Sequence, residues 1–169
     1  MKKRLVPALL GLIALLALIA TWGCAAARVY PVKGPLSLQT PPPIYSAKMS
    51  GVFYSGTFST ALDGEKFTGH WERVPRDNAP SSKIPTPQDL SSEWDSVYGV
   101  GFYRFKVREA DFYLRTLATG NRGTILYVEM YRTEQRPVIG TNGNEIPIID
   151  MRGVARDNKG NVYKLIFRT

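Results

Sequence analysis

From residue 48 onward, apolar and polar residues alternate with a period of two, a pattern typical of strands with one buried face. The first such stretch, residues 49–61, alternates aromatic and β-branched residues with Ser and Gly. Asp63-Gly64 follows as a strong hairpin turn signal, because glycine tolerates positive φ. In residues 65–74, one face of the expected strand carries Phe67, Gly69, Trp71 and Arg73. The pattern therefore predicts a β-hairpin over residues 49–74.

Residues 96–107 show the most regular alternation in the chain and predict a further strand. Gly99 and Gly101 share one face of that strand, which indicates close approach of a neighbouring backbone or cover by an aromatic ring. The remaining expected elements are a strand at 112–119 (or a short helix at 109–117), a turn at 120–123, a strand at 124–132, a turn at 140–143, and a hairpin of strands 146–156 and 161–168 around 157–160.

These elements amount to about seven or eight short strands with polar turns and no long helix after the first 24 residues. The sequence thus predicts an all-β fold, a single antiparallel β-sandwich or small β-barrel, over residues 48–169. A chain of 169 residues has room for one ordinary domain.

Two segments rich in proline interrupt this pattern. Residues 24–47 include Pro41-Pro42-Pro43 and predict a tether, with a loop on the domain surface as the alternative and Val29-Tyr30 able to pair as a short edge strand. Residues 75–95 predict a long loop, either functional or a disordered insertion, with one helical turn possible at 88–94.

The amino terminus has the three parts of an export signal. Lys2, Lys3 and Arg4 precede an apolar run, residues 5–20, and small residues follow. The basic start is expected to stay at the cytoplasmic face. We therefore interpret residues 1–23 as a signal peptide.

The chain's one cysteine, Cys24, stands where this apolar run ends. Thr21-Trp22-Gly23-Cys24 resembles the lipobox of bacterial lipoproteins, in which the cysteine is acylated and becomes the mature amino terminus, although Thr21 and Trp22 depart from the usual residues. The resemblance implies lipid attachment at Cys24, and Ala25 after it implies the outer membrane, facing the periplasm. Cleavage after Ala27, giving a soluble periplasmic protein, and retention as an uncleaved membrane anchor are the alternatives.

Charge and composition narrow the function classes. The formal charge of +8 falls to +5 when the three cations of the signal peptide are removed, and the remainder forms no basic block. One Cys and one His exclude an intramolecular disulfide and a Cys/His zinc site, so we expect no metal and no cofactor. Export also argues against nucleic acid as a partner.

Candidate catalytic groups have simpler structural explanations. Asp63 and Glu65 bracket a turn, where solvated turn residues are expected rather than a catalytic pair. Residues 157–161 lack the spacing of a calcium loop, and Lys159 within them would repel a cation. His70 falls on the polar face of its strand without a nucleophile motif. Gly99-Val100-Gly101 lacks the third glycine of a nucleotide-binding loop. We therefore predict no catalytic residues.

Arginines interleave with aromatic residues between positions 98 and 115, as occurs at protein interfaces and sugar-binding surfaces. Most of these aromatics are expected to pack in the core. The possible binding surface consists of Tyr98, Phe102, Arg104, Arg108 and Arg115.

Two stretches, Ser55–Gly69 and Gly153–Leu165, resemble uncharacterised small lipoproteins of Gram-negative bacteria. That resemblance implies an acylated amino terminus joined to one β-rich domain and implies no activity. We therefore expect a non-enzymatic envelope lipoprotein that contacts membrane lipid through Cys24 and binds an envelope protein or glycan. The alternative is a small lipoprotein inhibitor of an enzyme such as lysozyme.

Overall fold

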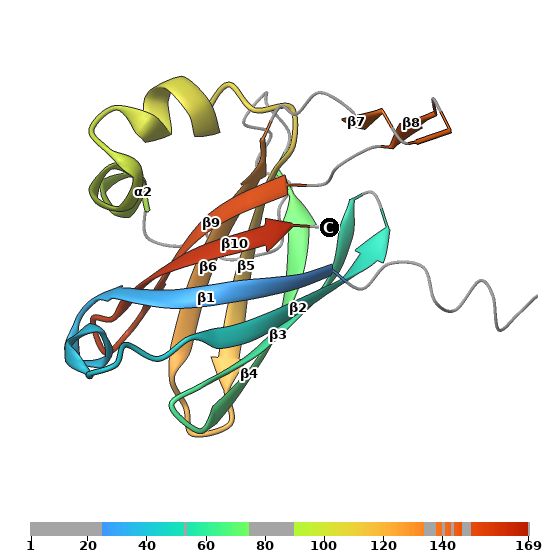
Figure 1. The fold of residues 1–169 in the computed structure, drawn as a ribbon. Coiled ribbons are helices and arrows are strands. Elements are labelled where there is room, and N and C mark those ends of the chain that lie inside the picture. The colour runs from blue at the N-terminus through green and yellow to red at the C-terminus, as the bar shows by residue number, and fades with distance from the viewer. Residues whose placement is uncertain are drawn as a thin grey trace, which may run out of the picture.

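The computed structural model describes residues 25–52, 54–74, 90–133, 138–139, 141–142, 144–146 and 150–168. Eight antiparallel strands close into a barrel in the order β1-β10-β9-β6-β5-β4-β3-β2 (Figure 1). Their bounds are β1 Ala25–Lys33, β2 Tyr45–Val52, β3 Ser55–Leu62, β4 Glu65–Arg73, β5 Tyr113–Gly120, β6 Ile125–Arg132, β9 Asp150–Asp157 and β10 Val162–Arg168. A small separate hairpin pairs β7 (Val138–Ile139) with β8 (Glu145–Ile146). The predicted all-β fold is confirmed, as a barrel rather than a sandwich.

Several predicted hairpins are present. Asp63 and Gly64 both have positive φ and join β3 to β4, as two-residue hairpin turns require. The strands expected at 112–119 and 124–132 are β5 and β6, and the last hairpin is β9–β10. The segment 49–61 is not continuous, since Tyr54 lies in a turn that separates β2 from β3.

The prediction of a tether over residues 24–47 is wrong, and so is the domain start at residue 48. Residues 25–33 form strand β1, which pairs with β10 on one side and β2 on the other and closes the barrel. Ala27 and Val29 of this strand are buried in the core. The proline-rich stretch is confined to the β1–β2 connection, which contains the short 3-10 helix η1 (Pro35–Leu38).

The strand predicted over residues 96–107 is also wrong. That segment belongs to helix α2 (Ser91–Tyr98) and the π-helix η2 (Tyr103–Val107), which lie against the outside of the barrel (Figure 1). Leu90, Trp94 and Tyr98 are spaced four residues apart and so share one helical face. Gly99 and Gly101 have positive φ and form the reversal between the two helices, instead of facing a neighbouring strand.

Alternate residues of each strand fill the barrel interior with apolar side chains, including Phe58, Phe67, Leu114, Leu126 and Phe167. A second buried cluster lies outside the barrel wall, between α2–η2 and the strands β6 and β9. For this reason residues 128–131 of β6 are all buried, and the period of two disappears there.

The barrel has two distinct rims. At the N-terminal rim, β1 begins at Ala25, close to the end of β10 (Figure 1). At the opposite rim, which we call the turn rim, η1 and the turns β3–β4, β5–β6 and β9–β10 lie together.

The predicted signal peptide, Cys24 and most of the 75–95 loop lie outside the described residues. Within the described part of the chain, no helix has the length and apolar character needed to span a bilayer.

Candidate functional site

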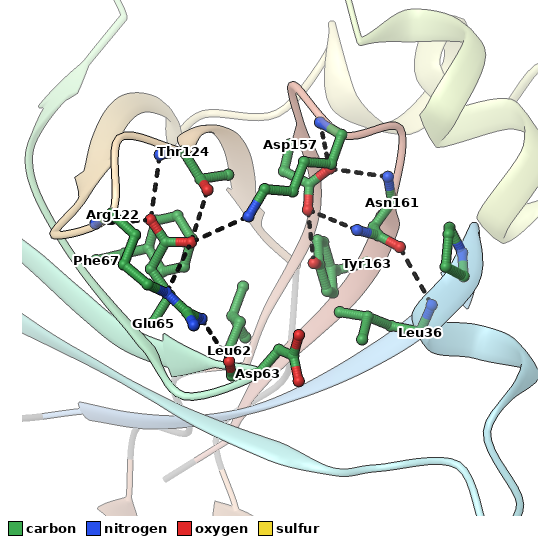
Figure 2. A pocket seen from close by; sticks show the side chains of 12 residues that line it. Leu36, Leu62, Asp63, Glu65, Phe67, Arg122, Thr124, Asp157, Asn161 and Tyr163 are labelled. Atoms are coloured by element: carbon green, nitrogen blue, oxygen red, sulfur yellow. Dashed lines mark hydrogen bonds and ion pairs between the residues drawn. The ribbon is translucent and has the colours of Figure 1, made fainter.

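A pocket of about 180 Å³ opens at the turn rim (Figure 2). Leu36 of η1, Leu62 and Phe67 of the β3–β4 hairpin and Tyr163 of β10 supply apolar lining. Its polar lining comprises Asp63, Glu65, Arg122, Thr124, Asp157, Lys159 and Asn161. This volume is below the roughly 300 Å³ at which pockets for drug-sized ligands begin.

Glu65 is the central side chain on one side of this pocket and is only 1% exposed. The Thr124 backbone N–H and the Arg122 backbone N–H donate to its Oε1, each at 3.1 Å. The Thr124 hydroxyl donates to Oε2 at 2.6 Å, and Lys159 Nζ donates to the same atom at 3.2 Å. Gly120 makes room for this carboxylate, since an added Cβ would lie 2.1 Å from Oε1.

These contacts decide the charge of Glu65. Burial alone would raise the pKa of the carboxyl, but hydrogen bonds from Thr124, Lys159 and Arg122 favour the ionised form more strongly. The net result lowers the pKa of Glu65 to about 2. Glu65 is therefore a permanent anion at neutral pH that ties the β5–β6 and β9–β10 turns to the start of β4.

Asp157 forms a second buried network on the other side of the pocket (Figure 2). It accepts hydrogen bonds from the backbone N–H groups of Lys159 and Asn161 at 2.9 and 2.8 Å. The Asn161 amide and the Tyr163 hydroxyl donate to its other oxygen, both at 2.8 Å. Asn161 Oδ1 in turn accepts from the Leu36 N–H at 3.2 Å, which attaches η1 to the same turn.

Because each carboxylate accepts four hydrogen bonds, both are occupied in holding the turns together. Only the side chains of Arg122 and Lys159, which are 55% and 59% exposed, reach solvent from this network. Within the described residues, no group of three or more His, Cys, Asp or Glu side chains is arranged to hold a metal ion. The turn-rim pocket therefore has the chemistry of a structural closure.

The ionisation of Glu65 predicts a specific dependence of stability on pH. The pKa of its carboxyl is about 2 in the folded protein, against an ordinary value of 4.5 in an unfolded chain, so its contribution is fully present above pH 4.5. That contribution is lost as the pH falls from 4.5 towards 2. We expect Glu65→Gln to have a lower melting temperature than the wild type at pH 7 and a flatter profile below pH 4.5. Circular dichroism melts across this range measure the difference, and parallel profiles would contradict it.

Glu65 is buried, contrary to its expected place as a solvated turn residue. The signal was available, because Glu65 is in phase with Phe67 and Trp71 on the inward face of β4. Asp63 is exposed in the turn as expected. His70 is exposed on the polar face of β4, also as expected. Residues 157–161 form the predicted hairpin turn.

The five residues of the predicted binding surface do not form one exposed surface: two of them are exposed and three are partly buried. Tyr98 and Phe102 stack on each other at 4.8 Å and on Trp94 at 5.5 and 6.1 Å, so both are partly buried and pack against the buried cluster under α2–η2. The Tyr98 hydroxyl donates to backbone carbonyls of β9 and β10, and burial raises its pKa. Arg104 and Arg108 are exposed on the outer side of the same segment.

Arg115, the fifth residue, forms hydrogen bonds with side chains beside the buried cluster instead. Its Nε donates to Glu129 Oε1 at 3.1 Å and to the Tyr113 hydroxyl at 2.9 Å. Glu129 also accepts the Trp94 indole N–H at 2.9 Å. Burial raises the pKa of Glu129, although Arg115, Tyr113 and Trp94 oppose the shift. Glu129 thus links helix α2 to the barrel wall.

The exposed part of residues 99–108 combines apolar and basic side chains. Val100 is 99% exposed between Gly99 and Gly101, and Phe105 is 68% exposed. The Arg104 guanidinium lies 5.5 Å from the centre of the Phe105 ring. Asp95 fixes this turn, because its carboxylate accepts the N–H groups of Gly101 and Tyr103 at 3.0 and 2.9 Å. We call Val100, Arg104, Phe105, Lys106 and Arg108 the basic turn.

No family model, curated protein or solved structure matches this chain.

Proposed function

We propose that this chain is a non-enzymatic lipoprotein of the cell envelope, anchored by an acylated Cys24 in the outer membrane and facing the periplasm. In this proposal the basic turn binds another envelope component that carries negative charge. The observation that supports binding is the exposure of Val100 and Phe105 in the same segment as the exposed cations Arg104, Lys106 and Arg108. Apolar and arginine side chains of this kind are enriched at binding surfaces.

Two features favour binding over catalysis. The barrel interior is filled by side chains, and the buried carboxylates of the turn-rim pocket, Glu65 and Asp157, each accept four hydrogen bonds. The anchor rests on the sequence alone, on the apolar run at residues 5–20 and the Gly23-Cys24 pair that follows it.

The anchor is tested by Cys24→Ala. Because acylation needs the cysteine sulfur, we expect this variant to lose metabolic labelling with a fatty acid and to leave the membrane fraction on extraction. The wild-type chain serves as the control. Unchanged labelling and membrane retention in the variant would contradict lipid anchoring.

The basic turn is tested by neutralising Arg104, Lys106 and Arg108 together to Gln in the full chain and measuring capture of envelope components. A matched control neutralises Arg28, Lys48 and Lys66, which are exposed on β1, β2 and β4. Both variants lose three positive charges, so their net charge is the same. A difference in capture between them would therefore come from the position of the basic turn. We expect the first variant alone to lose capture, and equal losses would overturn the assignment of the surface.

A further inference from the structure

At the N-terminal rim of the barrel, arginine side chains lie over aromatic rings. The Arg73 guanidinium lies 5.5 Å from the centre of the Phe112 ring and 5.9 Å from that of Tyr54. The Arg132 guanidinium lies 5.7 Å from the same Phe112 ring. We call Tyr54, Arg73, Phe112 and Arg132 the rim cluster. Phe112 attaches this cluster to the core, because its ring contacts the buried Trp71 edge-on at 6.4 Å.

The backbone holds the rim cluster in place. The Arg73 N–H donates to the Tyr54 carbonyl at 2.8 Å, and the Arg132 N–H donates to the Phe112 carbonyl at 3.0 Å. The Arg73 side chain donates to the Asp111 carbonyl at 2.7 Å. Both arginines are exposed, and Tyr54 is 71% exposed.

The arginines at the N-terminal rim are exposed to solvent. Among the described residues, neither Arg73 nor Arg132 forms an ion pair with a carboxylate. In the described part of the chain, Asp111 and Asp150 lie at this rim, and each has an interaction partner in the protein. Arg168 ends β10 at the same rim and is also exposed.

The chain also joins its apolar amino-terminal run to this rim. The run ends at Ala20, and β1 begins at Ala25. Five residues span at most roughly 18 Å even when fully extended. Cys24 is covalently adjacent to the rim. A membrane that holds either the acylated Cys24 or the apolar run is therefore close to the rim cluster.

We propose that the rim cluster contacts the headgroups of an anionic lipid bilayer and holds the barrel with its turn rim pointing away from the membrane. Guanidinium groups bind lipid phosphates in a bidentate manner, and tyrosine is enriched at membrane interfaces. This inference rests on the proposed anchoring of the amino terminus. In this orientation the rim cluster faces the lipid, and the basic turn remains accessible to the proposed envelope partner.

The orientation is measured with the full chain reconstituted in vesicles of phosphatidylcholine with or without phosphatidylglycerol. A fluorophore is attached at Tyr54→Cys or, as the matched control, at Leu38→Cys, which is exposed on η1 at the turn rim. A quencher carried by the lipid headgroups reports proximity. The wild-type chain treated with the same fluorophore reports whether the Cys24 thiol is free.

We expect strong quenching at position 54 in anionic vesicles, weaker quenching in neutral vesicles or high salt, and little quenching at position 38 in either case. Arg73→Gln with Arg132→Gln lowers quenching at position 54, whereas Lys48→Gln with Lys66→Gln leaves it unchanged. Circular dichroism checks that each variant is folded. The comparison of anionic with neutral vesicles needs no arginine variant, so it tests the proposal even if those variants do not fold.

Equal quenching at the two positions, or quenching at position 54 that is the same in anionic and neutral vesicles, overturns the rim assignment. In those cases the chain still floats with the vesicles, so the proposed anchor survives. A chain that does not float with the vesicles, or whose wild-type Cys24 is labelled, overturns the lipid anchor itself.

Discussion

Trp94→Ala is expected to destabilise the protein by about 3–5 kcal/mol, the range typical of a buried aromatic truncated to alanine. Trp94 is fully buried at the centre of the cluster between α2 and the barrel. The change removes its stacking with Tyr98 and Phe102 and its edge contact with Tyr131 at 5.6 Å. It also leaves Glu129 without the indole donor. Urea denaturation measures the change in the free energy of unfolding.

The loss should be concentrated in the helical segment, because Trp94 lies outside the barrel wall. Hydrogen exchange is therefore expected to rise most over residues 91–107 and less in β2 and β3, which lie opposite β6 and β9 in the barrel. Phe105→Ala is the matched control, since that aromatic belongs to the same segment and is mostly exposed. Its expected effect is within about 0.5 kcal/mol. A Trp94→Ala loss no larger than that of Phe105→Ala would contradict the packing described.

Trp94→Phe separates the ring from its hydrogen bond. Phenylalanine keeps most of the stacking and removes the donor to Glu129. Because Arg115 still donates to that carboxylate, we expect a smaller loss, about 1–3 kcal/mol.

Turn chemistry made the hairpins predictable from the sequence, whereas barrel closure depends on contacts distant in the chain. Asp63-Gly64 and residues 157–160 carry residue types that favour tight turns, and both join the strands expected. On one side β1 pairs with β10, more than a hundred residues away, and no local pattern in residues 25–33 indicates that pairing. Proline and glycine flank the segment and favoured a tether, although Val29-Tyr30 already had the character of a short strand.

The helical segment shows how one sequence can fit two periods. Residues 96–107 alternate as a strand would, yet Leu90, Trp94 and Tyr98 also recur at helical spacing. The helix is favoured because β6 and β9 present Tyr131 and Val154 on the outer wall, and these need apolar cover. That requirement exists only once the barrel is closed. The same fact explains why only Arg104 and Arg108 of the predicted binding residues are exposed.

The β9–β10 turn depends on Asp157 more than its sequence suggests. Its carboxylate accepts four hydrogen bonds, two from backbone N–H groups and two from the buried side chains of Asn161 and Tyr163. Asp157→Ala removes the acceptor for all four donors, and each buried donor left unpaired costs about 1–3 kcal/mol. We expect a total loss of about 3–5 kcal/mol in urea denaturation. Asn158→Ala, the exposed neighbour, is the matched control and should lose much less.

A double-mutant cycle shows whether unpaired donors account for this loss. Tyr163→Phe alone removes one donor to Asp157, and in the Asp157→Ala background it removes a hydroxyl that has already lost its acceptor. Tyr163→Phe should therefore destabilise the Asp157→Ala variant less than it destabilises the wild type. We expect this difference, the coupling energy, to be about 0.5–3 kcal/mol. Additive losses would mean that the Tyr163 hydroxyl finds another partner, and that Asp157 acts through the backbone of the turn alone.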